Sequence, residues 1–321
     1  MATLVSGLGY IGSALVERLL ADGEEVIGLE NYFSTPREPI EKLAGSGQLR
    51  AIKGSVSDPR AVERAFAAAP IETVFHLAAQ ASAQPDAAPT SYTQETNYGG
   101  PRILLDACVA HGVRRVVFAS STRIYRLPLP PRLTERSPLG PTDLVHLSHL
   151  YGELLLAAYR PRGISGAAAR LGIVHGVSPV MRTDARFLAV PQRFCLQAAR
   201  GEPLRVATGA SSYLAFVHIA DAVQGLLCLR DAPDDVEVAN VACEVRSVAE
   251  VARTVREAGR ERGLEVRIEY DGRPGAAAPR SIGSALNRVG FKPRHRIAEG
   301  VAEVLDHYLT VEGRTRTAVN E

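Results

Sequence analysis

Short runs that favour β-strands alternate with helical patterns through the first half of this 321-residue chain. The strand-like runs are rich in branched apolar residues, and the segments between them carry apolar residues at i, i+3 and i+4 spacing. We expect strands at residues 3–6, 25–29, 49–53, 73–78, 115–120 and 166–171, and helices at 11–22, 59–68, 99–111 and 144–159. Such alternation indicates right-handed βαβ units and a parallel sheet. The chain is therefore predicted to be an α/β protein.

A glycine-rich segment stands where the first expected strand meets the first expected helix. It reads Ser-Gly-Leu-Gly-Tyr-Ile-Gly from Ser6 onward, which is the GxGxxG pattern. Gly7 permits a tight turn, Gly9 lets the backbone approach a pyrophosphate, and Gly12 allows the helix to pack closely on the strand. The positive end of the helix then faces the phosphates. The pattern predicts a dinucleotide site and a doubly wound parallel sheet of the Rossmann type.

An acidic residue follows the second expected strand. Glu30 lies 18 residues after Gly12, close to the separation of about 20 in the dinucleotide fingerprint. Its carboxylate would accept hydrogen bonds from the ribose hydroxyls and repel a 2′-phosphate. The neighbouring Asn31 adds no positive charge. The sequence therefore favours NAD over NADP.

The pattern loosens after about residue 175. Helical runs at 187–200, 219–230, 247–262 and 297–308 are separated by loops rich in proline and glycine. We expect an NAD-binding Rossmann domain at 1–175 with a returning segment near 215–243. A smaller C-terminal substrate-binding lobe should comprise 176–214 and 244–312, and 313–321 should form a polar tail.

Composition excludes several classes of protein. No apolar run approaches the roughly 20 residues of a membrane span, and the first residues lack the layout of a signal peptide. The four cysteines are scattered without CxxC or CxxH spacing, so we expect free thiols, a reducing and cytoplasmic compartment, and no metal site. The net charge is +2 without a basic block. The sequence gives no reason to expect a nucleic-acid or membrane partner.

Five further segments carry family motifs. Residues 75–80 (Phe-His-Leu-Ala-Ala-Gln) are similar to HLAAQ, Asn97 matches the asparagine of TNxxGT, and 117–125 resemble FxSSxxVYG. Residues 216–221 (Phe-Val-His-Ile-Ala-Asp) resemble FVHVDD, and 273–275 (Arg-Pro-Gly) resemble RPGD. Over nearly its whole length the chain resembles the NAD-dependent epimerase/dehydratase family, the extended short-chain dehydrogenases typified by nucleotide-sugar 4-epimerases.

The resemblance implies NAD as the cofactor and a nucleotide sugar as the small-molecule substrate. Together with the glycine motif, it implies these cofactor-binding residues: Gly7, Gly9, Tyr10, Ile11, Gly12, Glu30, Asn31, Ser55, Val56, Leu77, Ala78, Ala79, Gln80, Asn97 and His149.

Catalysis in this family needs a Tyr-x-x-x-Lys pair. The tyrosine moves a proton to or from the sugar hydroxyl, and the lysine binds the nicotinamide ribose and lowers the tyrosine pKa from about 10. A Ser or Thr adds a hydrogen bond to the reacting oxygen, and Ser121 occupies that position. The family frame PLxPxxxYxxSKxxxE aligns without a gap on residues 138–153, which places Val145 at the tyrosine and His149 at the lysine. The usual acid/base pair is absent.

His149 is the candidate replacement. It would lie one helical turn beyond Val145 on the same face, and an imidazole with a pKa of about 6.5 suits proton transfer near neutrality. His146 and Tyr151 should be turned off that face and serve packing or lie exposed. Ser121 and His149 are therefore the predicted catalytic residues.

The substrate end also departs from the family. Thr122 and Arg123 replace the Asp-Glu pair of 4,6-dehydratases, so dehydration by that mechanism is not expected. Ile173 replaces an asparagine, and Leu214 replaces an arginine that clamps the substrate phosphates. The predicted substrate-binding residues are Thr122, Arg182, Arg186 and Arg273, with Arg280 as a supplement.

Three functions fit this pattern. The first is an NAD-dependent nucleotide-sugar epimerase or oxidoreductase with a non-standard active site. The second is a catalytically silent relative that keeps NAD and acts as a binding or sensing subunit. The third is an enzyme on a non-nucleotide substrate. The family also pairs the helices expected at 99–111 and 144–159 across a two-fold axis, and apolar residues such as Leu104, Leu147 and Leu154 favour a homodimer here.

Overall fold

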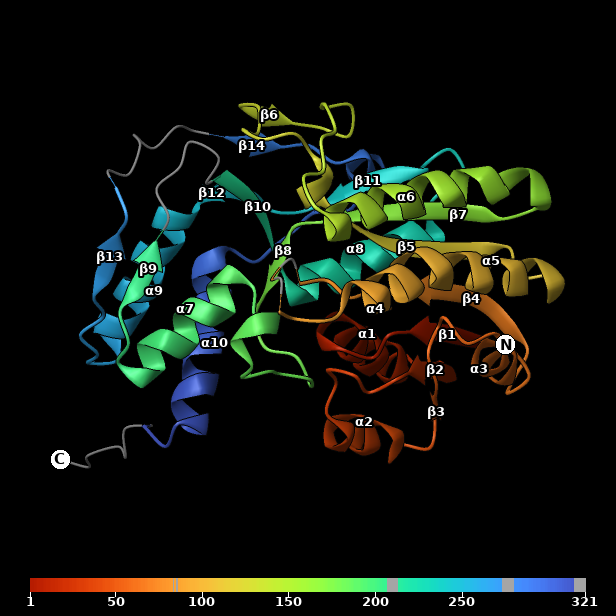
Figure 1. The fold of residues 1–321 in the computed structure, drawn as a ribbon, viewed down its shortest axis with the longest axis horizontal. Helices are drawn as coiled ribbons and strands as arrows, with labels where there is room; N and C mark the ends of the chain where they lie inside the picture. Colours follow the sequence, from red (N-terminus) through yellow and green to blue (C-terminus); the bar gives the residue numbers. More distant parts are fainter. Residues whose placement is uncertain (83, 85, 207–212, 273–279, 315–321) are drawn as a thin grey trace.

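The computed structural model describes residues 1–82, 84, 86–206, 213–272 and 280–314 (Figure 1). Seven parallel strands form the central sheet in the order β11-β7-β5-β4-β1-β2-β3. Their bounds are β1 Ala2–Ser6, β2 Val26–Glu30, β3 Leu49–Lys53, β4 Ile71–His76, β5 Arg115–Ser121, β7 Ser165–Leu171 and β11 Val238–Val241. The strand order reverses between β1 and β4, which is where ligands bind in open sheets of this kind. The predicted doubly wound Rossmann architecture is confirmed.

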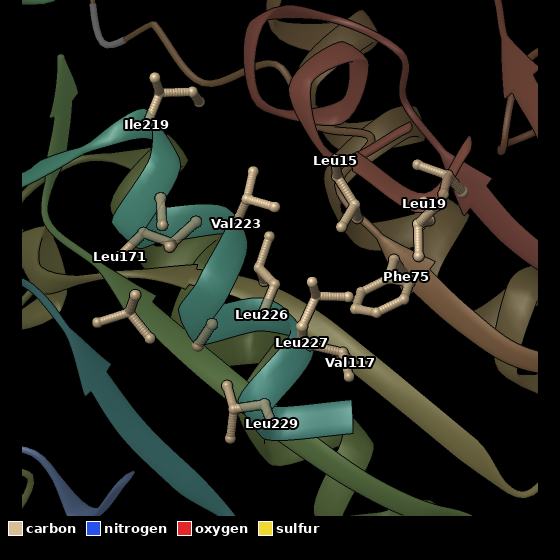
Figure 2. Close-up of a cluster of buried hydrophobic side chains, with 14 of the residues drawn as sticks. Leu15, Leu19, Phe75, Val117, Leu171, Ile219, Val223, Leu226, Leu227 and Leu229 are labelled. Atoms are coloured by element: carbon tan, nitrogen blue, oxygen red, sulfur yellow. The ribbon is translucent and has the colours of Figure 1, made fainter. Parts of the chain in front are cut away.

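Helices cover both faces of the sheet. One face carries α1 (Tyr10–Ala21), α2 (Arg37–Ala44) and α8 (Ile219–Asp231), and the other carries α3 (Pro59–Phe66), α5 (Gly100–Ala110) and α6 (Leu144–Tyr159). Side chains alternate along each strand, so Val5 joins one buried cluster and Leu4 the other. Figure 2 shows Leu226 and Leu227 of α8 in the same cluster as Leu15 of α1. The two buried clusters on either face of the sheet fix the positions of the carboxyl ends of its strands.

Side chains fix where several helices begin. Asp58 accepts a hydrogen bond from the Arg60 N–H at the start of α3, and Asp143 accepts one from the His146 N–H at the start of α6. Ser247 and Glu250 form a capping box at the start of α9 (Val248–Glu261). Each cap satisfies backbone donors that a helix leaves free at its first turn.

A second group of helices packs beside the sheet. Helices α7 (Val190–Arg200), α9 and α10 (Ile297–Val311) share a buried cluster of their own and lie to the left of the sheet in Figure 1. Small sheets accompany them: β8 (Ile173–His175) with β10 (Tyr213–His218) and β12 (Glu244–Ser247), β9 (Leu204–Val206) with β13 (Ile268–Tyr270), and β6 (Arg132–Leu133) with β14 (Ser281–Ile282).

The structure differs from the expected elements in a few places. Helix α2 was not predicted because only Ile40 is buried on it, so it has no apolar stripe. Helix α7 begins at Val190 rather than 187, since Pro191 sits in its first turn. Ahead of α5, α4 (Thr90–Gln94) and a π-helical turn (Glu95–Gly99) are already helical. Of the expected returning segment, only β11 joins the central sheet.

Within the described residues, no helix is long and apolar enough to cross a membrane. The same residues contain no group of three or more His, Cys, Asp or Glu side chains placed to hold a metal ion. Cys108 and Cys195 are free and buried, and Cys228 and Cys243 are free and half-buried.

Candidate active site

One cavity of about 560 Å³ opens at the carboxyl ends of the strands. The turn after β1 and the segment after β4 line it, so it lies where the strand order reverses. It continues past the end of β5 to α6, and α7 with the segment before it closes the other side. Predicted cofactor residues that line it are Gly7, Gly9, Tyr10, Ile11, Gly12, Glu30, Asn31, Val56, Leu77, Ala78, Ala79, Gln80 and His149.

The glycine turn has no room for side chains. Gly7 adopts a φ of +86°, and a Cβ there would lie 2.6 Å from the Ala78 backbone nitrogen. A Cβ on Gly12 would lie 1.9 Å from the Gly7 carbonyl oxygen. A Cβ on Gly9 would instead enter the cavity, 2.9 Å from Nη2 of Arg182. These three positions fit the bare backbone that a bound pyrophosphate requires.

Glu30 is buried at the end of β2 and lines the cavity. Its Oε2 accepts a hydrogen bond from the Leu8 N–H at 2.7 Å, and its Oε1 accepts one from the Tyr32 N–H at 2.9 Å. Each carboxylate oxygen can accept a second hydrogen bond. The backbone therefore aims an acceptor pair at the place where the fingerprint puts the adenosine ribose.

Two predicted cofactor residues act at a distance from the cavity. Asn97 accepts a hydrogen bond from the Gln80 N–H, and it donates to the Gln80 carbonyl and to Ser148 Oγ. Its side chain is buried and fixes the segment after β4 against α6, outside the cavity lining, and its role as a cofactor ligand stays a prediction. Ser55 does not line the cavity either, and its hydroxyl is hydrogen-bonded to that of Ser57.

Ser121 lies at the end of β5 and lines the cavity. Its Oγ accepts a hydrogen bond from the Arg123 N–H at 3.1 Å, which leaves the hydroxyl proton free to be donated. Tyr125, expected to be structural, is buried and donates from its hydroxyl to Asn240. The structure thus brings Ser121 to the cavity and keeps Tyr125 away from it.

His149 also lines the cavity, as predicted from the motif. Its Nδ1 lies 3.3 Å from the Ala119 carbonyl oxygen, which makes Nδ1 the donor and leaves Nε2 as an acceptor. Burial lowers the pKa of His149 to about 4, and repulsion from His146 acts in the same direction. The expectation of titration near neutrality is therefore wrong. Val145, at the tyrosine position, is buried and supplies no polar atom.

His146 was expected to turn away, but it is buried and lines the cavity. Its Nδ1 contacts Oδ2 of Asp143, whose Oδ1 caps α6. Burial and the positive charge of Arg123 lower the pKa of His146, whereas Asp143 acts to raise it. The prediction for His146 failed because it took the helix face that carries Val145 as the face toward the cavity. His146 and His149 are i, i+3 neighbours on one face of α6, and this face meets the cavity.

The predicted substrate residues are dispersed. Thr122 is buried, donates to the Leu171 carbonyl and does not line the cavity, so its role at the substrate stays a prediction. Arg186 is exposed and paired with Asp184, outside the cavity lining. Arg280 stacks on Tyr213 at 4.3 Å and does not line the cavity. Arg273 lies outside the described residues.

Arg182 does line the cavity, but at the glycine turn. Its Nε is buried without a hydrogen-bond partner among the described residues, and its backbone carbonyl accepts a hydrogen bond from the Tyr308 hydroxyl of α10 at 2.6 Å. Sequence reasoning missed two further cations of the lining, Arg123 and Arg193. Arg123 stands inside the 117–125 motif, where its departure from the Asp-Glu pair was the available signal, whereas Arg193 belongs to no motif and reaches the cavity through the packing of α7.

Comparison with known proteins identifies the family of this chain. Residues 3–242 match the model of the NAD dependent epimerase/dehydratase family. UDP-glucuronic acid decarboxylase 6 of Arabidopsis thaliana is 27% identical over 314 residues, which cover 93% of this chain and 85% of the relative.

Solved structures agree. UDP-glucose 4-epimerase of Thermus thermophilus, determined with NAD, is 27% identical, with a TM-score of 0.80 and coverage of 96% of this chain and 99% of that one. MoeE5, determined with UDP-glucuronic acid and NAD, is also 27% identical, with a TM-score of 0.79 and coverage of 97% and 99%. The predicted resemblance and the prediction of NAD are confirmed at the level of the family, and the chain belongs to the NAD-dependent epimerase/dehydratase family.

Proposed function

We propose that this protein is an NAD-dependent enzyme that oxidises and reduces a hydroxyl-bearing carbon of a nucleotide sugar, as an epimerase or oxidoreductase with a non-standard active site. One observation carries the proposal. A single cavity joins the glycine turn and Glu30 to Ser121, His146 and His149. The relatives' UDP-sugar substrates support the substrate class.

The cofactor end fits NAD. The turn at Gly7, Gly9 and Gly12 would hold the pyrophosphate, and Glu30 would hold the adenosine ribose. His149 stands at the lysine position and offers Nε2 as an acceptor, so it would hold a nicotinamide ribose hydroxyl. A neutral imidazole replaces a charged ammonium in this role. Bound NAD supplies a hydride acceptor and donor.

Oxidation of an alcohol also needs a proton acceptor. His149 is a poor one, because its pKa of about 4 makes it a weak base. His146 is better placed, since Asp143 holds its Nδ1 and leaves Nε2 as the basic atom. We assign proton transfer to His146 and a hydrogen bond to the reacting oxygen to Ser121, both of which line the cavity.

The test is turnover of a panel of nucleotide sugars by the NAD-loaded protein, with products resolved by NMR. We expect an inverted or oxidised carbon with at least one sugar, and deuterium at that carbon to slow the reaction. A protein that binds NAD and the sugars without converting any of them would contradict the proposal.

The second candidate is a silent NAD-binding relative, favoured by the buried Val145 that brings no hydroxyl. Replacing Val145 by Tyr and His149 by Lys discriminates the two. Epimerase activity that appears only in this double variant would support the silent relative. The third candidate, an enzyme on a non-nucleotide substrate, rests on Ile173 and Leu214, which line the cavity in place of polar residues.

We also propose a homodimer formed through α5 and α6. Leu147 and Leu154 of α6 are 46% and 64% exposed, whereas Leu104 of α5 is fully buried against the sheet. Leu154→Arg should place a charge in the interface and yield monomers in analytical ultracentrifugation, while Leu104→Arg should unfold the protein instead. A dimer that persists in Leu154→Arg would contradict this interface.

Four free thiols also support a reducing, cytoplasmic setting.

A further inference from the structure

Three arginines line the cavity without an ion pair to any of the described residues: Arg123, Arg182 and Arg193. Burial lowers the pKa of each guanidinium, which means that the surroundings penalise its charge. The three side chains are half-buried and line the cavity, so a ligand anion there would gain from an unpaired guanidinium. The lining therefore favours a ligand or ligands that carry negative charge.

The three cations lie in different parts of the cavity lining. Arg182 lies over the glycine turn, where a pyrophosphate of the cofactor would bind. Arg193 is in α7, on the side of the second helix group. Arg123 lies two residues after Ser121, and its N–H donates to Ser121 Oγ. The charge of its guanidinium also acts on His146, so Arg123 is the cation of the lining beside the two residues assigned to the reaction.

Among the described residues, no acid forms an ion pair with Arg123. Asp143 acts on it electrostatically, but both oxygens of Asp143 are engaged, one with the His146 N–H and the other with His146 Nδ1. Within the described part of the chain, the Arg123 side chain makes no hydrogen bond, and it is only half-buried. Its donors remain available to a molecule in the cavity.

We propose that Arg123 binds a carboxylate on the sugar, so that the preferred substrate is a nucleotide sugar acid. The inference rests on the proposed function, because it places the sugar beside Ser121. A guanidinium binds a carboxylate through two parallel N–H donors. The diphosphate of such a substrate lies several bonds from the reacting carbon, so the group that reaches Arg123 belongs to the sugar ring.

Calorimetry on the NAD-loaded protein tests this with UDP-glucuronic acid, UDP-glucose and UDP. We expect UDP-glucuronic acid to bind about tenfold to hundredfold more tightly than UDP-glucose, as hydrogen bonds to a charged group allow. Arg123→Gln should abolish that preference and leave UDP-glucose and NAD binding within a few-fold. Arg123→Lys should keep part of it. The matched control is Arg126→Gln, which changes an exposed arginine of the same loop outside the cavity lining.

The remaining outcomes overturn the inference in distinguishable ways. Equal affinity of the wild type for the two sugars, or a preference that survives Arg123→Gln, would contradict the carboxylate alone. Equal weakening of both sugars and of UDP in Arg123→Gln would show that Arg123 binds the diphosphate. Failure of all three ligands to bind would contradict the proposed function, and this inference with it.

Discussion

The two ends of the cavity differ in how they are built. The end that comprises the glycine turn and Glu30, the cofactor end, is shaped mainly by the backbone. Its glycines leave space, and the N–H groups of Leu8 and Tyr32 orient the Glu30 carboxylate. At the other end, beside Ser121 and α6, where we propose that the sugar binds (the sugar end), side chains such as Arg123, His146 and His149 form the lining. Backbone features tolerate few substitutions, whereas side chains at the mouth of a cavity can be exchanged without loss of the fold. One end can thus keep a shared cofactor while the other changes chemistry.

The largest effect should come from filling the cofactor end. Gly9→Val puts a branched side chain into the cavity, toward Arg182, and we expect NAD affinity to fall about 100-fold or more, which corresponds to roughly 2.8 kcal/mol. Calorimetry measures the affinity and circular dichroism verifies the fold. The control is Gly99→Ala, since a Cβ on Gly99 meets no atom within 4 Å. NAD binding that survives Gly9→Val would break the assignment of this end.

Replacing each histidine of α6 in turn should distinguish the residue that transfers the proton from the residue that binds NAD. His146→Asn should lower turnover by about 10²–10⁴ and leave NAD affinity within a few-fold, because it removes the proton acceptor. His149→Asn should weaken NAD more than it slows the chemical step. The control is His111→Asn, a histidine that pairs with Glu63 away from the cavity. The reverse pattern would assign proton transfer to His149.

The pH dependence follows from the same pair. A neutral His146 is the active form, and its pKa is lowered by burial. Turnover should therefore be level through neutrality and fall only on the acidic side of about 6.5, the ordinary histidine value. His149, with a pKa of about 4, should contribute no step near neutrality. A rate that falls between pH 8 and 7, read from a kcat profile, would contradict a lowered His146 pKa.

A smaller effect should separate the two dinucleotides. Glu30→Gln removes the charge that repels a 2′-phosphate while keeping one acceptor oxygen, so we expect NAD to bind about tenfold more weakly and the preference over NADP to shrink. Competition between NAD and NADP for the purified protein measures this. Glu41→Gln, an exposed residue of α2, is the control. Tighter binding of NADP than NAD by the wild type would contradict the prediction that Glu30 repels a 2′-phosphate.

Most of the fold and the cofactor end could be predicted from sequence, because their signals are local. Strand and helix periods set the sheet, and Gly7, Gly12 and Glu30 act at fixed spacing along one βαβ unit. The placement of Thr122 and Arg186 outside the cavity lining could not be predicted, because their partners, the Leu171 carbonyl and Asp184, cannot be seen in a motif.

The sugar end escaped prediction for a further reason. Val145 and His149 were correctly placed on one helix, yet the direction of the cavity relative to that helix depends on how α6 packs. His146 lies about 100° around the helix from Val145, so the side of α6 that faces the cavity decides whether His146 lines it. The pKa of His149 likewise depends on burial, which no spacing reveals.

The hydrogen bond from Tyr308 to the Arg182 backbone carbonyl connects the cavity to α10. Arg182 lies over the glycine turn, while Tyr308 belongs to α10 near the far end of the chain. A ligand that engages the Arg182 side chain would therefore favour conformations in which its segment stays docked on α10. At a concentration 100 times its dissociation constant, such a ligand adds about 2.7 kcal/mol to the docked state. Loss of such a ligand would then weaken the docking of α10 before any strand of the sheet unfolds.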